Sequence, residues 1–83
     1  MPDFKVGLVT HYYDKIGVAV VDLSGDLVVG DKIRIVNDDK EFTQEVVSMQ
    51  IEHKQVKVAK KGQTIGLKID KPTKEKAEIY KIS

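Results

Sequence analysis

The sequence contains no cysteine and no tryptophan, and it has only two prolines. Without cysteine, no disulfide can hold the fold together, so its stability has to come from packing. No apolar run approaches the about 20 residues that a bilayer-spanning helix needs. The start, MPDFK, lacks the basic and apolar segments of a secretory signal. These absences predict a cytoplasmic protein that does not associate with a membrane.

Residue types suited to catalysis or metal binding are also scarce. The two histidines, His11 and His53, lie far apart in the sequence, and there is no cysteine nucleophile. His11 and Asp14 are three positions apart, and such positions face opposite sides of a strand, so we do not expect them to share a metal. The stretch GQTIG lacks the Lys-Ser/Thr that completes a phosphate-binding loop. We therefore expect no enzymatic activity, no metal and no cofactor.

What the sequence does contain is a series of short β segments separated by turn residues. The 83 residues correspond to a single domain, 1–83, with one modest core. Alternation of apolar and polar residues predicts which side chains face inward. The predicted inward-facing residues are Phe4, Val6 and Leu8 in FKVGLV, Ile33 and Ile35 in KIRIV, and Ile65, Leu67 and Ile69 in QTIGLKI.

The segment EFTQEVVSMQIEH changes its apolar phase along its length. Phe42 and Val46 share one parity, whereas Val47, Met49 and Ile51 share the other. A phase change within a strand indicates a β-bulge or a sharp bend. No segment shows a helical apolar stripe. About six to seven short strands in so small a domain favour an all-β fold, a small closed antiparallel β-barrel, because closure removes exposed sheet edges.

Charge is distributed unevenly along the chain. Residues 1–53 hold five Lys/Arg and ten Asp/Glu, a net −5, and residues 54–83 hold nine and three, a net +6, which together give the +1 of the chain. The basic excess is densest in EHKQVKVAKKG (residues 52–62), where four lysines and a histidine face one acid, Glu52. Such asymmetry favours a polyanionic partner. The alternative is that the two halves interleave in the fold and their fields average out.

The order of the segments resembles a known family. The chain reads VGLVTHYYDKIGVAVVDLSGDLVVGDKIRI and then FTQEVVSMQIEHKQVKVAKKGQTIGLKI. It resembles the second domain of the translational GTPases, the β-barrel of elongation factor Tu and initiation factor 2. The resemblance rests on VGDKI at 29–33, VSMQI at 47–51 and AKKGQTIGL at 59–67, and it covers nearly the whole chain. The family's GTPase domain has no counterpart here, so the resemblance does not imply GTP binding.

The resemblance implies a contact with RNA. In the elongation factors this domain helps to hold the 3′ end of aminoacyl-tRNA, which points to tRNA or ribosomal RNA as the partner of the lysine-rich loop. Lysine suits contact with phosphate, but the aromatic residues typical of single-strand binding lie outside this segment. The predicted RNA-binding residues are His53, Lys54, Lys57, Lys60, Lys61 and Lys68. Val56, Val58 and Ala59 are predicted to anchor the loop.

Five further residues are predicted to form structural turns and to bind nothing. They are Gly25, Gly30, Asp31, Gly62 and Gly66. Gly66 is expected either at a corner or within a strand where two backbones approach closely. The glycines suit these places because glycine tolerates the positive φ of tight turns.

A second reading of the chain is a protein-interaction module. The same barrel type resembles the C-terminal module of some collagenase-like peptidases, where it is an accessory domain. On this reading the chain docks on a larger protein such as a peptidase or a GTPase, and the acidic residues 1–53 provide the docking face. Both readings remain open at the level of sequence, and co-purification of a protein partner after nuclease treatment discriminates between them.

Overall fold

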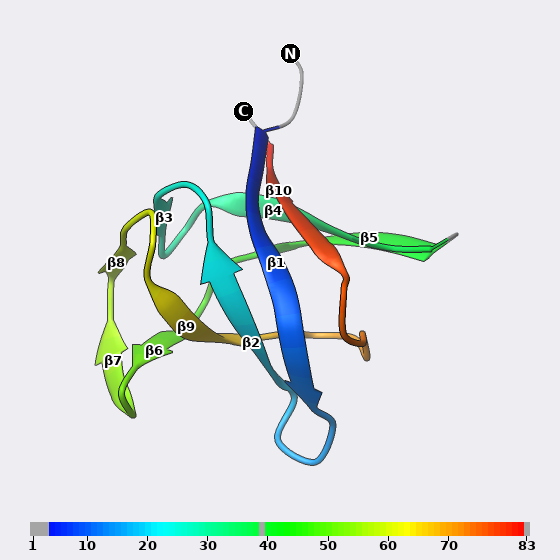
Figure 1. Ribbon diagram of the computed structural model, residues 1–83, viewed down its shortest axis with the longest axis horizontal. Helices are drawn as coiled ribbons and strands as arrows, with labels where there is room; N and C mark the ends of the chain where they lie inside the picture. The colour runs from blue at the N-terminus through cyan, green and yellow to red at the C-terminus, as the bar shows by residue number, and fades with distance from the viewer. Residues whose placement is uncertain (1–3, 39, 83) are drawn as a thin grey trace.

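The computed structural model describes residues 4–38 and 40–82, and within them the chain forms ten β-strands and no helix (Figure 1). The strands are β1 (Phe4–Tyr13), β2 (Val18–Leu23), β3 (Leu27–Val28), β4 (Lys32–Asn37), β5 (Lys40–Glu45), β6 (Met49–Ile51), β7 (Lys54–Val56), β8 (Val58–Ala59), β9 (Thr64–Lys68) and β10 (Glu78–Lys81). The prediction of an all-β domain is therefore confirmed. In this part of the chain no helix exists that is long and apolar enough to cross a membrane.

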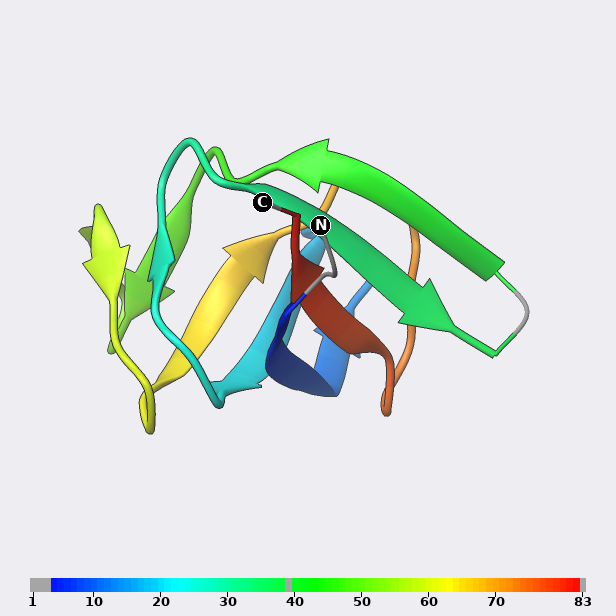
Figure 2. The same ribbon diagram turned by 90° about the horizontal axis from the view of Figure 1, so that it is seen from above.

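Eight strands form one antiparallel sheet in the order β5-β4-β10-β1-β2-β9-β6-β7, and β3 pairs with β8 in a separate two-stranded sheet. The large sheet is bent, so that β4 and β5 lie across the core from β2 and β9 (Figure 2). Its ladder ends at β5 and β7, which pair with β4 and β6 respectively among the described strands. Closure into a complete barrel therefore remains a prediction.

The first strand departs from simple alternation. Val6, Gly7 and Val9 are buried, whereas Phe4 is 56% exposed and Leu8 is 37% exposed. The register of β1 shifts between Lys5 and Gly7 against β10. It shifts again between Val9 and His11 against β2. Each bulge adds one residue and reverses which side chains face inward. The prediction that Phe4, Val6 and Leu8 share the buried face was therefore wrong for Phe4 and Leu8.

The other predicted inward-facing residues are confirmed. Ile33, Ile35, Ile65, Leu67 and Ile69 are each no more than 3% exposed. They belong to a single core made of aliphatic side chains. Tyr12 and Phe42 pack against this core from its margin.

The predicted break in the segment 41–53 is also present. β5 ends at Glu45 and β6 begins at Met49. At the break Val46 is buried, whereas Val47 is 57% exposed. Val46 is held in place by two backbone hydrogen bonds, because its N–H donates to Asp31 O (2.8 Å) and its carbonyl accepts from Gly30 N (2.8 Å). The chain thus changes direction here without losing its backbone hydrogen bonds.

The side chain of Gln44 links two parts of the sheet that are not neighbours in the strand order. Gln44 Nε2 donates to the carbonyl of Lys68 (2.9 Å), and the N–H of Asp70 donates to Gln44 Oε1 (2.8 Å). Gln44 is only 8% exposed, so these bonds satisfy a polar group that is mostly removed from water. One side chain therefore ties β5 to the end of β9.

The predicted turn residues occupy different kinds of position. Gly30 and Gly62 have φ angles of 101° and 92°, a conformation that favours glycine. Asp31 accepts a hydrogen bond from Val28 N on its Oδ2 (2.9 Å), which closes the turn before β4. Gly25 follows β2, and a Cβ there would lie 3.2 Å from Val6 Cγ1. Gly66 is not in a turn, because it lies within β9 and pairs with Val20 and Gln50.

The acidic and basic halves of the sequence are mixed in the fold. β10, from the basic half, lies between β4 and β1, and β9 lies between β2 and β6. Ion pairs join the halves at Lys81–Asp31 and Lys74–Asp38, each at 3.2 Å, and at Lys5–Glu78 (2.9 Å). The structure thus supports interleaving of the halves, and the described residues 4–38 and 40–53 do not form a separate acidic face.

Candidate interaction surface

The lysine-rich segment 52–62 is a pair of strands with two turns, and the prediction that it is a loop was wrong. It contains β7 and β8. Glu52 and His53, with φ angles of 51° and 67°, form the two-residue turn between β6 and β7, where Ile51 pairs with Lys54. Two positive φ angles in succession are the signature of a type I′ hairpin. The segment is ordered because Val56 is half-buried against the core and Ala59 is fully buried.

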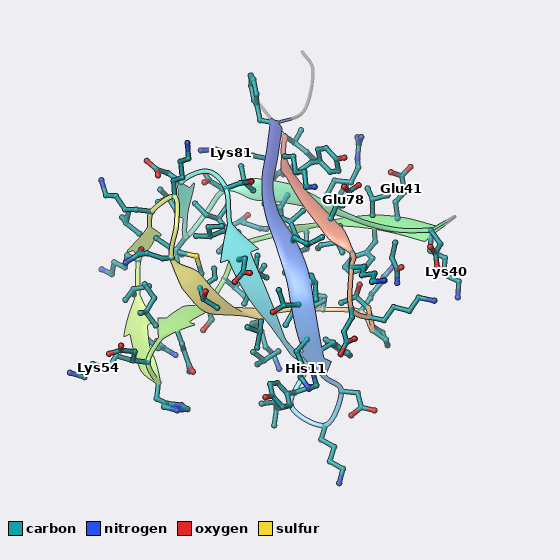
Figure 3. The ribbon with its side chains drawn as sticks, in the orientation of Figure 1. His11, Lys40, Glu41, Lys54, Glu78 and Lys81 are labelled. Atoms are coloured by element: carbon teal, nitrogen blue, oxygen red, sulfur yellow. The ribbon has the colours of Figure 1, made fainter. Side chains whose placement is uncertain are left out.

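The six residues predicted to bind RNA do not form one cluster. His53 and Lys54 lie at the β6–β7 turn, Lys57 between β7 and β8, Lys60 and Lys61 in the turn before β9, and Lys68 at the end of β9. Lys54 points outward at the edge of the molecule, away from the β4–β5 hairpin that carries Lys40 and Glu41 (Figure 3). Lys68 is separate from the others, since its Nζ donates to the Ile16 carbonyl at 2.8 Å in the β1–β2 turn.

The turn that carries Lys60 and Lys61 is fixed through its backbone. Lys60 N donates to Gln63 Oε1 (2.7 Å), and Lys61 N donates to Asp26 Oδ1 (2.9 Å). Among residues 4–38 and 40–82, no ion pair involves the Nζ of Lys54, Lys57, Lys60 or Lys61. These four ammonium groups are therefore held on an ordered backbone and remain available to a partner.

Beside these lysines lies a group of exposed valines, which we name the valine patch: Val28, Val29, Val47 and Val58. Val47 is 57% exposed and Val58 is 48% exposed. Val28 and Val58 are direct cross-strand partners in the two-stranded sheet. Val29 N donates to the Lys57 carbonyl at 2.9 Å. Val29 and Val47 also line a common hollow of about 230 Å³ with Lys57. Val28 and Val58 therefore lie on the outer face of the two-stranded sheet, and Val29 and Val47 lie at the hollow beside it.

The exposure of Val58 contradicts the prediction that it anchors the segment. In β8 the side chain of Ala59 faces the core, so that of Val58 faces solvent. The sequence held a signal for the valine patch in its adjacent pairs Val28-Val29 and Val46-Val47. Neighbouring residues in a strand face opposite ways, so one valine of each pair has to point away from a single buried face.

Further hollows lie elsewhere on the described part of the molecule, and two of them are larger than the one beside the valine patch. One, of about 290 Å³, runs over β2, β9 and β6 and is lined by Tyr13, Ile16 and His53 among others. The other, of about 640 Å³, lies between the end of β1 and residues 72–76, where Thr73 has a buried hydroxyl without a hydrogen-bond partner. The residues that the structure describes contain no group of three side chains placed to hold a metal ion. His11 instead contacts Glu75 at 3.3 Å.

None of the three tyrosines lies among the free lysines. Tyr12 packs against the core, and Tyr13 stacks edge-on with His11, with 4.3 Å between the ring centroids. The Tyr80 hydroxyl donates to Glu78 Oε1 at 3.1 Å. Tyr13 approaches the segment only where it shares the hollow with His53. The valine patch therefore offers no aromatic platform for stacking nucleobases.

Lys5 and Glu78 form an ion pair away from the valine patch, with 2.9 Å between Lys5 Nζ and Glu78 Oε2. The hydrogen bond from Lys5 and then that from Tyr80 hold the pKa of Glu78 below its ordinary value. The same contact with Glu78 raises the pKa of Lys5. Both groups are charged over the neutral range, so they form a structural ion pair between β1 and β10. Neither shift produces a group ready to donate or accept a proton near neutral pH.

Comparison with known proteins points to peptidases. No family model matches the chain. Over 77 residues the chain is 40% identical to an uncharacterised protease of Methanocaldococcus jannaschii, a match that covers 92% of this chain and 19% of that protein. The chain thus spans about a fifth of the length of this relative.

Two similar solved structures are of the C-terminal domain of a Geobacillus thermoleovorans U32 peptidase. One superposes with a TM-score of 0.88 at 23% identity and covers 98% of this chain and 93% of that domain. Its selenomethionine variant superposes with a TM-score of 0.85 at 22% identity, over 90% and 95% of the two chains. This chain and that C-terminal domain therefore share one fold over nearly their whole length.

These comparisons overturn the resemblance to the second domain of the translational GTPases. The similar chains are a protease and a peptidase domain, not elongation factor Tu or initiation factor 2. The motifs behind the resemblance were turn and strand signals, such as Gly30-Asp31 and Gly62, which shape a small β domain whatever it binds. The tRNA or ribosomal RNA contact inferred from that resemblance loses its support. The chain has the fold of the C-terminal domain of a U32 peptidase.

Proposed function

We propose that this chain is an accessory domain of a peptidase of the U32 type and that it packs against the catalytic part of that peptidase. The observation that carries the proposal is the match to the Methanocaldococcus jannaschii protease. Nearly all of this chain corresponds to about a fifth of that protein, so most of that protein is other polypeptide. The partner is then either a separate subunit or the remainder of the same polypeptide.

We further propose that the domain contributes binding and not catalysis. Several of its polar side chains pair across the sheet, as in Lys5–Glu78, Lys81–Asp31 and the contacts of Gln44. A catalytic site instead needs a nucleophile or metal beside a base and an orienting group. The bonds that Gln44 makes to the end of β9 also support closure of the sheet into a barrel. A rigid barrel suits a domain that presents a fixed surface.

Affinity purification from cells that produce the peptidase tests the proposed function. The tagged chain is isolated before and after nuclease treatment, and the retained proteins are identified by mass spectrometry. We expect a stoichiometric U32-type peptidase that survives nuclease. An unrelated tagged β domain of equal net charge serves as the control. Retention of RNA alone, or the absence of any peptidase, would overturn the proposal.

A further inference from the structure

We propose that the valine patch and the lysines beside it form the surface that docks on the catalytic part of the peptidase. The proposal rests on the proposed function and identifies the surface that carries it out. The matching surface on the partner has apolar side chains at its centre and carboxylates around them. Two observations lead to this partner: the chemistry of the surface, and the large share of the related protease that lies outside the match.

The apolar centre has the arrangement of a contact surface. Val28 and Val58 lie opposite each other across the two-stranded sheet, and Val29 and Val47 line the hollow next to it. Single exposed apolar side chains are ordinary, but several that gather in one region and are rimmed by polar residues are typical of an interaction site. The residues come from β3, β8 and the β5–β6 connection, all at one end of the molecule (Figure 2). Their backbone is fixed by the hydrogen bonds of Val29 and Val46.

The rim of the patch is basic. Lys57 lines the same hollow as Val29 and Val47, and Lys60 and Lys61 follow Val58 in the next turn. Their ammonium groups make no ion pair within residues 4–38 and 40–82. Carboxylates on the partner would complement these charges and orient the two surfaces. A second copy of this chain is a poor partner for the same surface, because its lysines would face each other across the two-fold axis.

The opposite end of the sheet carries charged residues that disfavour association with another chain. β5 is an edge strand that exposes Lys40, Glu41 and Glu45. Charged side chains on an edge strand disfavour pairing with another chain. The valine patch lacks such charges at its centre. Because the β5 edge is charged and the centre of the valine patch is not, the valine patch is the better candidate for the docking surface.

Site-specific photo-crosslinking tests the docking surface. Benzoylphenylalanine is placed at Val58 in the patch, at Thr43 on β5 and at Ile16 in the β1–β2 turn, in cells that produce the peptidase. All three positions are exposed, so the fold should tolerate the insertion. We expect crosslinks to the catalytic part of the peptidase from position 58 and not from position 43, and the crosslinked peptide should contain Asp or Glu.

The other outcomes separate the two proposals. Crosslinks to the peptidase from position 16 or 43 but not from 58 would overturn the docking surface and leave the proposed function standing. The absence of peptidase crosslinks at every position would overturn both. Crosslinks from position 58 to RNA, or to a second copy of this chain, would also contradict the docking surface.

A pair of charge insertions provides a matched control. We expect Val47→Asp to lower the crosslink yield from position 58 by at least about tenfold. The substitution places a carboxylate in the apolar centre of the patch, and this carboxylate would face the carboxylates of the partner. Thr43→Asp, on β5, should leave the yield unchanged. Thermal unfolding of both variants shows whether they are folded, and equal yields from two folded variants would contradict the proposal.

Discussion

At the scale of single residues, Gly7 shows how the bulges of β1 determine which substitutions the strand can accommodate. Gly7 is buried, and a Cβ placed on it would lie only 2.5 Å from Val21 Cγ1. The position gave no sign of this in the sequence, because the contact depends on the register shift between Lys5 and Gly7. The same shift explains why simple alternation placed Leu8 inward, whereas the structure exposes it.

We expect Gly7→Ala to lower the free energy of unfolding by about 1–3 kcal/mol, because the added methyl group forces Val21 or the backbone to move. Gly66→Ala is the matched control, since a Cβ there would meet Val18 Cγ1 at an ordinary 3.4 Å. Its effect should stay within about 1 kcal/mol. Urea denaturation measures both values, and equal destabilisation would show that loss of glycine in a strand, and not the clash with Val21, is responsible.

At the scale of elements, the strands β4 and β9 were predictable because their buried residues lie at every second position. Ile33 and Ile35 flank the less buried Arg34 in β4, and Ile65 and Leu67 flank the less buried Gly66 in β9. Gln44 could have been noticed as well, because it shares the parity of Phe42 and Val46, so a polar residue stands at an inward position. Its partners could not have been predicted, since the sheet order brings residues 68–70 to it from a distant part of the chain.

We expect Gln44→Leu to lower the free energy of unfolding by about 1–3 kcal/mol. Leucine fills a similar volume, but it leaves the Lys68 carbonyl and the Asp70 N–H without their partner at a site that is mostly removed from water. Thr43→Val, on the exposed side of the same strand, should change stability by less than about 0.5 kcal/mol. Denaturant unfolding compares the two, and a neutral Gln44→Leu would mean that the link between β5 and β9 does not stabilise the fold.

The hairpin between β6 and β7 gives a prediction of the opposite sign. His53 adopts a φ of 67°, which costs a residue with a Cβ about 1–2 kcal/mol. Glycine removes that cost but adds about 0.5–1 kcal/mol of unfolded-state entropy. We therefore expect His53→Gly to raise the melting temperature. Lys54→Gly, one residue later in β7, removes no cost of a positive φ, so it should lower the melting temperature. A lower melting temperature for His53→Gly would indicate that the imidazole stabilises the turn.

At the scale of the whole molecule, the unequal charges of the two sequence halves turned out to be a poor guide to the surface. Strand order mixes the halves, and Lys74 and Lys81 pair with Asp38 and Asp31. What remains of the predicted basic site is local: Lys57, Lys60 and Lys61 beside exposed valines. The sequence shows that these lysines are close together along the chain, but it could not show that Val58 faces outward, because both faces of so short a strand look alike in sequence.

The contribution of these three lysines can be separated from that of net charge. Reversal of Lys57, Lys60 and Lys61 to Glu changes the net charge from +1 to −5, since each reversal subtracts two. Reversal of Lys15, Lys40 and Lys71, which are also exposed, produces the same net charge away from the valine patch. Because exposed charges contribute little to folding, both variants should stay within about 1 kcal/mol of the parent in free energy of unfolding.

The two variants should differ in whether they retain the peptidase. We expect the Lys57/Lys60/Lys61 variant to lose the co-purifying peptidase, and the Lys15/Lys40/Lys71 variant to retain it, because only the first places acids opposite the carboxylates of the docking partner. The measurement is the peptidase yield per mole of tagged chain at two salt concentrations. Parallel loss in both variants would attribute the association to long-range net charge. Retention in both would show that the lysines beside the valine patch do not orient the complex.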